Sequence, residues 1–412
     1  MKKQVGGMSR ILTFTILSIS LLTVMAGAAV APALGIIHQH FSETPDMLIK
    51  FIVSMPALFI IIVNLLFTKV CRLLRTRTIA LIGLLMYVVC GCGAFLVDNI
   101  ASLLVLRALL GVSVGLIMPL STGLLAYYFP PQQMAQLMGL SAAMNQMGGV
   151  VATLLAGILA TIGWNYAFLV YALGLIAVVM VIIYLPNERL TPARGYKQEA
   201  RQVEPEIDER ERMTLVREQG VWIMLRRFHP SIVGMLLCMM TFFVFVSNFA
   251  ITESERFDTM TITWIMVGVD VIAFIAGMIF GQIMHAMPRQ MKYMAPIAFM
   301  MGFALMAFGG NTAVVVAGGV LIGCANGIGV PYLNTIASIK GGKESVTTVM
   351  PLISAALYLG QFISPVVVGS CSNLLFAGNM RGPYIVAIIL SVIYMLQVTT
   401  TRHFQSLPPQ NN

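Results

Sequence analysis

The chain has 412 residues, of which 58% are hydrophobic and only 10% charged, and its mean hydropathy is +0.88. A soluble globular chain carries about 25% charged and about 45–50% apolar residues. This composition excludes a soluble enzyme and a disordered protein, and predicts a polytopic membrane protein. The net charge of +9 is therefore interpreted through the positions of the basic residues relative to the membrane spans, and not as a sign of nucleic-acid binding.

Twelve apolar segments follow one another along the chain, each long enough to cross a bilayer as a helix. Their apolar residues are continuous and do not alternate, which indicates helices and not the strands of a barrel. The predicted fold class is an all-α polytopic membrane protein with twelve transmembrane helices. The segments are 11–37, 47–68, 77–97, 100–127, 135–162, 165–186, 231–252, 261–284, 292–309, 312–338, 346–375 and 382–401.

The distribution of Lys and Arg predicts the orientation of these spans. With the N-terminus inside, 21 of the 25 basic residues lie on the cytoplasmic side, 3 lie outside, and Arg107 lies within a span. Cationic residues collect in cytoplasmic loops. We therefore expect a multi-pass protein of the bacterial cytoplasmic membrane with both termini in the cytoplasm. The apolar run that begins at Ile11 is too long for a cleaved signal peptide and is predicted to be the first span.

One long polar stretch divides the chain into two halves of six spans. The predicted domains are an N-terminal half, 1–187, a cytoplasmic linker with an amphipathic helix, 188–229, a C-terminal half, 230–404, and a cytoplasmic tail, 405–412. Charge pairs at i,i+4 in the linker, such as Glu206 with Arg210, favour the helix.

A glycine and proline pattern repeats between the halves at a constant offset of 212 residues. The first copy comprises Gly111, Gly115, Pro119, Gly148 and Gly157, and the second comprises Gly323, Gly327, Pro331, Gly360 and Gly369. The repeat predicts two parallel six-helix units related by an axis along the membrane normal.

Motifs in spans four and five carry a resemblance to a known family. Span four reads Leu103-x3-Arg107-x3-Gly111, and span five is glycine-rich from Gly139 through Gly148-Gly149 to Gly163-Trp164. Together with the repeat, this pattern resembles the major facilitator superfamily, and within it the drug/proton antiporter-like efflux proteins. The basic loop at 68–77 lacks the glycines and the aspartate that this family carries there.

The resemblance implies a secondary transporter that works by alternating access around a cavity at the bilayer midplane. It further implies export of an amphipathic or lipophilic small molecule in exchange for protons. The expected partners are this substrate, protons and the lipid bilayer, with no nucleic acid, for a protein that acts as a monomer. No cofactor and no metal site are expected, and no nucleotide-binding G-x4-G-K-[ST] motif occurs.

Only Arg107 and Asp270 are ionisable residues well inside the predicted spans. A charge in the bilayer core costs several kcal/mol unless it faces a partner or a cavity, so both are candidates for proton coupling or gating. Counting places both roughly 10–14 Å below the outer face, and we hypothesise that they approach each other when the outer side is closed. The alternative is that backbone carbonyls neutralise Arg107 while Asp270 faces water between the halves. Glu253, at the outer end of span seven, is interpreted as a solvated loop acid.

Two further sets of residues complete the predicted site. Polar side chains near mid-span are candidates for a mostly apolar substrate cavity, or for hydrogen bonds between helices: Asn145, Gln146, Asn326, Tyr358 and Gln361. Small residues and prolines are candidates for close helix packing and for gating kinks: Gly111, Gly115, Pro119, Gly148, Gly149, Gly157, Gly323, Gly327, Pro331, Gly360 and Pro365.

Two other functions stay open at this point, a permease and a sensor, whereas an enzyme is not expected. An uptake or facilitated-diffusion permease for a polar metabolite such as a sugar would need a cavity richer in charge than these spans provide. An intramembrane enzyme would need a catalytic constellation at one depth, and the G-x-S-x-G match at Gly111–Gly115 lies mid-span without the strand and turn of a nucleophile elbow. A non-transporting membrane sensor is distinguished only by a flux assay.

Overall fold

The structure, a computed structural model, describes residues 2–129, 131–187, 209–341, 349–377, 379–401 and 404. Residues 188–208 of the predicted linker and the predicted tail, 405–412, lie outside this range, and the domain boundaries stay a prediction. Every regular element in the described residues is a helix. In chain order they are α1 (Lys2–Ala28), η1 (Ala31–Ala33), α2 (Leu34–His40), α3 (Asp46–Leu73), α4 (Thr76–Gly93), η2 (Ala94–Leu96), α5 (Ile100–Tyr128), α6 (Pro131–Ala160), η3 (Trp164–Leu173), α7 (Gly174–Tyr184), α9 (Glu209–Thr252), α10 (Thr259–Ala286), α11 (Met291–Phe308), α12 (Thr312–Gly341), α13 (Met350–Leu375) and α14 (Gly382–Thr400).

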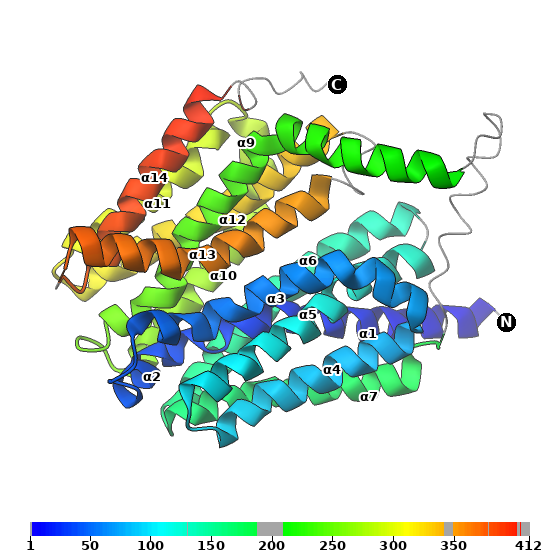
Figure 1. Cartoon of the computed structure of the whole chain (residues 1–412), viewed down its shortest axis with the longest axis horizontal. Coiled ribbons are helices and arrows are strands. Elements are labelled where there is room, and N and C mark those ends of the chain that lie inside the picture. The colour runs from blue at the N-terminus through cyan, green and yellow to red at the C-terminus, as the bar shows by residue number, and fades with distance from the viewer. Residues whose placement is uncertain are drawn as a thin grey trace.

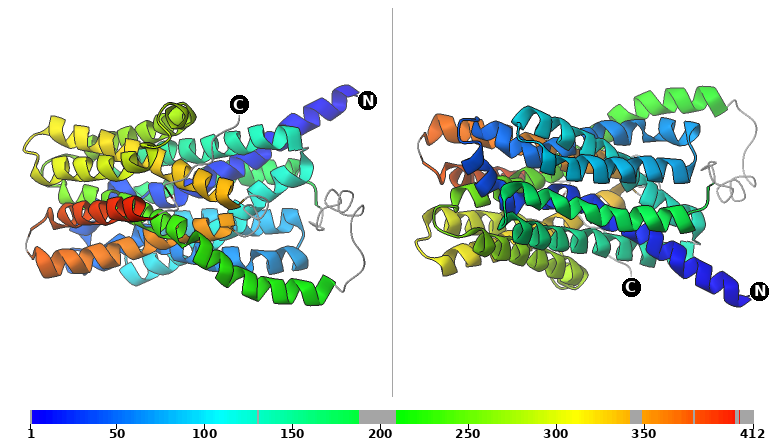
Figure 2. Two further views of the ribbon diagram at one scale, coloured as in Figure 1. Left: turned by 90° about the horizontal axis from the view of Figure 1, so that it is seen from above. Right: turned by 90° about the horizontal axis from the view of Figure 1, so that it is seen from below.

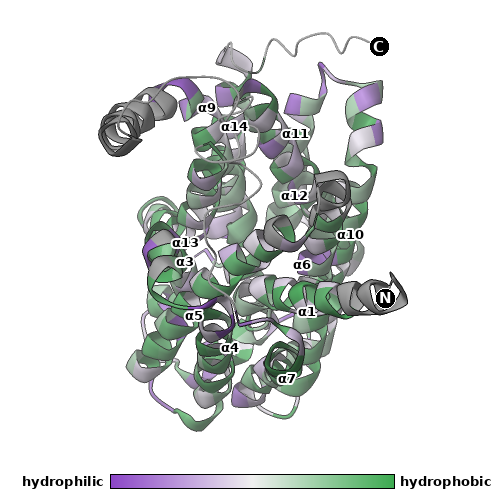
Figure 3. Cartoon of the chain, turned by 90° about the vertical axis from the view of Figure 1, so that its right-hand side faces the viewer, coloured by the Kyte–Doolittle hydropathy of each residue, from purple (hydrophilic) through white to green (hydrophobic). Residues whose placement is uncertain are grey.

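Twelve of the helical segments in the described residues are long and apolar enough to cross a membrane, which confirms the predicted fold class. Each segment coincides with a predicted span to within a few residues. Hydrophobic residues predominate along the helices, and hydrophilic residues gather mainly near the helix ends (Figure 3). A single mostly apolar surface of this kind is what a lipid environment requires.

The helices form two groups, α1–α7 and α9–α14, that lie side by side (Figure 1). The short connections between consecutive spans at 41–45, 161–163, 253–258 and 309–311 mark one face, which we name the hairpin face. The opposite face carries the N-terminus and the first half of α9, and we name it the linker face (Figure 2). The ribbons of the two halves converge at the hairpin face and diverge toward the linker face (Figure 1).

The first span differs from the predicted continuous helix because it is broken in the half nearer the hairpin face. Helix α1 ends at Ala28, η1 covers three residues, and α2 begins at Leu34. Pro32 lies in this break, and a proline has no N–H to donate to the carbonyl four residues earlier, while its ring clashes with that turn. The break turns residues 34–40 into a separate short helix at the hairpin face.

The sixth span begins as a ten-residue 3₁₀-helix, η3, before it continues as α7. Runs of this length are uncommon, because side chains three residues apart eclipse one another and the hydrogen-bond geometry is poorer. The same eclipsing brings Phe168 and Tyr171 onto one face of η3. That face lies against Arg107 of α5.

The glycine repeat packs in the same way in the two halves. A side chain at Gly111 of α5 would collide with the carbonyl oxygen of Pro56 in α3, and one at Gly323 of α12 would approach that of Val269 in α10 to 2.6 Å. Only glycine permits this contact between helix backbones. The relation recurs at Gly327 with Ala273, Gly148 with Leu21 and Gly360 with Leu236, whereas Gly115 packs against the side chain of Val63.

Candidate functional site

The two halves contact each other most closely near the hairpin face. Gly35 of α2 packs against α9, where an added Cβ would lie 2.5 Å from the carbonyl oxygen of Ala250. Gly157 of α6 packs against the side chain of Thr263 in α10, with 2.6 Å between an added Cβ and the Cβ of Thr263. These two contacts, one with a backbone carbonyl and one with a side chain, hold the halves together at the hairpin face.

Asp270 lies on this interface between the halves. Its Oδ2 accepts a hydrogen bond of 2.9 Å from Oγ1 of Thr153 in α6. Asp270 is half-buried and Thr153 is buried. The carboxylate therefore takes part directly in a contact between the N-terminal and the C-terminal half.

Arg107 is fully buried inside the N-terminal half. Its guanidinium carbon lies 4.6 Å from the ring centroid of Phe168 and 4.9 Å from that of Tyr171. Its Nη1 donates a 2.7 Å hydrogen bond to the hydroxyl of Tyr171, while Nε and Nη2 are buried without a partner. Cation–π contacts of this kind are worth about 2 kcal/mol or more where water is excluded, so the aromatic rings of η3 provide much of the compensation for this charge.

Tyr171 connects Arg107 to the break in the first span. Its hydroxyl donates a 2.9 Å hydrogen bond to the carbonyl of Ala26, in the last turn of α1. The C-terminal end of a helix carries a partial negative charge. Tyr171 thus lies between a buried cation and the negative end of α1. Its hydroxyl also provides a hydrogen-bond donor for the Ala26 carbonyl, which lies in the last turn of α1.

The hypothesised pair of Arg107 and Asp270 does not form in this conformation, although the hairpin side is closed. The guanidinium bonds Tyr171 and the carboxylate bonds Thr153, and no ion pair between them exists among the described residues. Similar depth along two spans did not imply contact, because Arg107 points into its own half. Depth follows from counting residues, whereas direction depends on packing.

The five predicted cavity residues differ in their contacts, and the cavity itself stays a prediction. Oδ1 of Asn145 accepts a 3.0 Å hydrogen bond from Thr23 within the N-terminal half, which is the helix–helix alternative. Tyr358 donates from its hydroxyl to the sulfur of Met118 across the halves, at 2.9 Å. Gln146, Asn326 and Gln361 are half-buried. Nε2 of Gln361 lies 3.7 Å from the sulfur of Met239, and the buried Oδ1 of Asn326 has no hydrogen-bond partner.

The remaining packing candidates have mixed environments. A Cβ at Gly149 would lie 3.2 Å from Val24 of α1, and Pro119, Pro331 and Pro365 lie inside α5, α12 and α13. Gly369, the repeat partner of Gly157, has nothing within 4 Å of an added Cβ. The sequence repeat is therefore not matched by equal contacts at this position.

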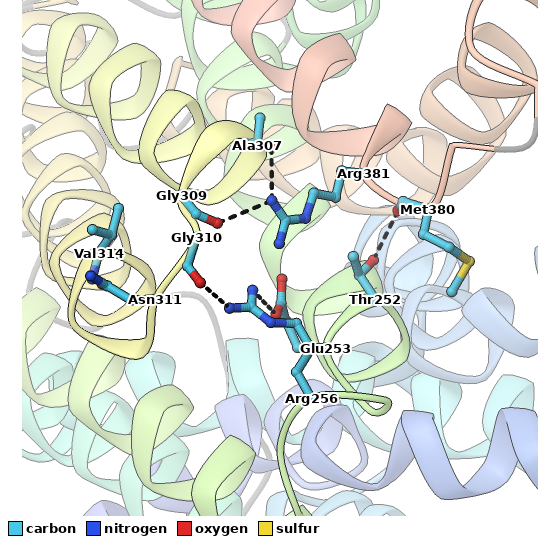
Figure 4. A network of polar contacts seen from close by, with 10 residues as sticks. All are labelled: Thr252, Glu253, Arg256, Ala307, Gly309, Gly310, Asn311, Val314, Met380 and Arg381. Atoms are coloured by element: carbon cyan, nitrogen blue, oxygen red, sulfur yellow. Dashed lines mark hydrogen bonds and ion pairs between the residues drawn. The ribbon is translucent and has the colours of Figure 1, made fainter.

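Glu253 is a buried residue, and its interpretation as a solvated loop acid was wrong. Its side chain is 0% exposed, its Oε2 accepts a 3.0 Å hydrogen bond from Arg256, and its Oε1 has no partner (Figure 4). Burial raises the pKa of Glu253, against the lowering effect of Arg256 and Arg381. Position at a span end was the only sequence signal here, and it does not report burial.

Arg256 and Arg381 join this acid to the end of α11. Arg256 donates to the carbonyl of Gly310, and Arg381 donates to those of Ala307 and Gly309, at 3.1–3.2 Å (Figure 4). Cations are favourable at a helix C-terminus, where the last carbonyls lack helical donors. The network ties the hairpin-face ends of α9 and α11 to Arg381, which directly precedes α14.

No metal-ligating group of three His, Cys, Asp or Glu side chains occurs among the described residues. The two histidines of the hairpin face each bond a carboxylate: His38 with Asp46 at 3.1 Å and His40 with Asp98 at 2.6 Å. His40 also stacks on Trp164, with 4.9 Å between ring centroids. Both histidines therefore hold α2 to its own half.

Residues 16–365 match the family model described as Major Facilitator Superfamily. The chain belongs to the major facilitator superfamily. This major facilitator protein thus has the family that the span-four and span-five motifs indicated, whereas its placement among drug/proton antiporters stays a prediction. No curated protein sequence matches it.

Solved structures resemble this major facilitator protein along nearly its whole length. A bacterial homologue of the human lysosomal transporter Spinster, in an inward-facing and unoccupied conformation, matches with a TM-score of 0.74 and 14% identity, over 97% of this chain and 99% of the other. A D-xylose–proton symporter matches with 0.70 and 14%, over 96% and 99%. The nucleoside transporter NupG matches with 0.67 and 13%, over 95% and 100%. At these identities the likeness shows the fold alone.

Proposed function

We propose that this protein exports an amphipathic or lipophilic small molecule across the bacterial cytoplasmic membrane in exchange for protons. With both termini in the cytoplasm, as the charge distribution favours, the linker face is cytoplasmic. The contacts at the hairpin face then correspond to an inward-facing state of an alternating-access cycle.

The observation that carries the proposal is the hydrogen bond between Asp270 and Thr153. An ionised carboxylate accepts a charge-assisted bond, which is roughly twice as strong as a bond between neutral groups. Protonation of Asp270 weakens this bond and removes the charge from the interface. Proton binding is thereby coupled to the contact between the two halves.

Arg107 is assigned a gating role that does not involve Asp270. It holds Tyr171, and Tyr171 holds the end of α1 directly before the break. Helix α2 follows the break and forms the backbone contact with α9. A change at Arg107 therefore acts on the position of the outer contact through two hydrogen bonds.

The cavity residues support an amphipathic substrate. Tyr358 and Gln361 contact the thioethers of Met118 and Met239, and methionine is a flexible, polarisable side chain suited to irregular apolar ligands. A few polar anchors among apolar side chains are typical of small-molecule sites. The alternative, uptake of a polar metabolite, has no observation of its own, since the fold is shared by transporters of many substrates.

Proton movement in liposomes tests the coupling. Purified protein is reconstituted with a pH-sensitive dye inside, and lipophilic cations, neutral drugs and sugars are added to wild type, Asp270→Asn and Asp258→Asn. We expect a lipophilic compound to drive proton flux in wild type and in Asp258→Asn, the exposed control acid at the hairpin face, but not in Asp270→Asn. If the compound crosses the membrane without proton movement, and does so at the same rate in wild type and in Asp270→Asn, the proposed exchange is refuted.

Inverted membrane vesicles, which expose the cytoplasmic face, test the direction. An acidic vesicle lumen should drive accumulation of the same compound, and accumulation should cease when the proton gradient is collapsed. Accumulation only in right-side-out vesicles would identify an uptake permease.

A further inference from the structure

A groove runs along the outer surface of the C-terminal half between α10 and α12. Its volume is about 410 Å³. One wall is formed by Trp264, Gly268 and Ile272 of α10, and the other by Val316 and Val320 of α12. Its polar lining includes Thr261 and Thr312, in the first turns of the two helices.

The groove lies on the exposed surface of the candidate spans and not at the interface between the halves. Trp264 is 56% exposed, Val316 41% and Val320 39%, although all three lie within membrane spans. At about 100° per residue, Gly268 lies on the opposite side of α10 from Asp270, which bonds α6 of the other half. In the view onto the linker face, α10 and α12 lie together at the edge of the helix bundle (Figure 3).

A missing side chain forms the floor of the groove. Gly268 is exposed, and an added Cβ there would meet nothing within 4 Å. The two helices nevertheless pack closely elsewhere, since a Cβ at Gly319 of α12 would lie 3.1 Å from Val269. The groove is thus a depression in a packed surface and not a gap between separate helices.

The length of the groove matches the thickness of one leaflet of the bilayer. From Thr261 to Ile272 the wall extends about 16 Å along α10, which is the thickness of one leaflet of a hydrocarbon core of about 30 Å. It begins at the hairpin-face end of both spans, where hydroxyls and an indole lie at the depth of the membrane interface. An apolar depression at this depth meets hydrocarbon and no water.

We propose that this groove binds one acyl chain of a lipid from the leaflet at the hairpin face. The chain packs between Trp264 and Val320 over Gly268, with its headgroup end beside Thr261 and Thr312. Dispersion contacts with the lining favour a seated chain, because an unfilled groove leaves these side chains without partner atoms on one side.

Quenching of Trp264 fluorescence tests this site. The chain contains only three tryptophans, so the signal of Trp264 is obtained as the difference between the protein and its Trp264→Phe variant. The detergent-solubilised protein is titrated with a phospholipid brominated on its acyl chain. We expect saturable quenching of the Trp264 component at about one lipid per protein.

Two variants that fill the groove and one matched control make the test specific. Gly268→Leu fills the floor and Val320→Phe narrows the groove from α12, so each should weaken the saturable component at least tenfold. Gly281→Leu is the control, because Gly281 lies on the same helix, outside the groove, and also has nothing within 4 Å of an added Cβ. Equal quenching in all variants, or quenching that never saturates, would show only general lipid contact and overturn the proposal.

Discussion

Gly35 of α2 and Ala250 of α9 lie backbone against backbone across the two halves of the protein. An added Cβ at Gly35 would approach the Ala250 carbonyl oxygen to 2.5 Å, closer than side chains tolerate. Helix α2 exists as a separate element only because the first span breaks before it. The contact between the halves at the hairpin face thus depends on a local feature of one helix.

Gly35→Ala is expected to open this contact. Overpacking of a tight contact costs about 1–3 kcal/mol, and the backbone oxygen opposite cannot rotate away. Hydrogen–deuterium exchange should become faster in residues 34–40 and 250–258. Gly27→Ala is the control, since Gly27 has nothing within 4 Å of an added Cβ. Unchanged exchange in Gly35→Ala would contradict the assignment of α2 to the contact between the halves at the hairpin face.

Tyr171→Phe should destabilise the protein, whereas Tyr87→Phe should not. Loss of the Tyr171 hydroxyl leaves Ala26 and a guanidinium nitrogen unsatisfied in a buried site, which costs about 1–3 kcal/mol. The buried hydroxyl of Tyr87, whose ring lies 5.4 Å from that of Tyr171, has no partner. Thermal denaturation in detergent compares the two, and equal melting temperatures would argue against the link from Arg107 to α1.

The dependence of stability on pH should contain a contribution from Glu253. Burial raises the pKa of this residue, so the folded protein keeps a proton that the unfolded chain releases. The contribution is fully present below the ordinary glutamate pKa and is lost as pH rises through the raised value. In the wild type, this contribution should make the melting temperature fall as pH rises through the raised pKa. In Glu253→Gln this fall should be absent.

Asp258 supplies a control of opposite sign. A hydrogen bond from Thr261 lowers the pKa of Asp258, which also caps α10. Its contribution is present above the ordinary aspartate pKa and is lost as pH falls through the lowered value. If Glu253→Gln and Asp258→Asn change the curve in the same direction, the burial of Glu253 is not what governs its titration.

The repeat partners Gly157 and Gly369 should respond differently to the same substitution. Gly157→Val meets Thr263 across the halves and should cost about 1–3 kcal/mol. Gly369→Val enters open space and should stay within about 0.5 kcal/mol. The comparison is made by thermal denaturation, and equal effects would mean that the sequence repeat, and not the contact, decides the outcome.

The membrane class, the twelve spans and the family could all be predicted from the sequence. Long apolar runs, the sidedness of Lys and Arg, and a glycine repeat at constant offset are local properties of the chain. The first two properties depend on the free energy of transfer of side chains into lipid, and the glycine repeat depends on how closely two helices can pack. Gly111 packs against the backbone of Pro56, and Gly323 packs against that of Val269 in the same way. The sequence repeat therefore corresponds to a repeated contact between helices.

Only the tertiary structure decided the contacts of the charged residues. Arg107 and Asp270 were found by their depth in the spans, yet their partners, Tyr171 and Thr153, depend on helix rotation and on the 3₁₀ conformation of η3. Glu253 was misread because burial at a span end is set by neighbouring connections. The groove over Gly268 was equally invisible, since an absent side chain forms a groove only where a second helix supplies the other wall.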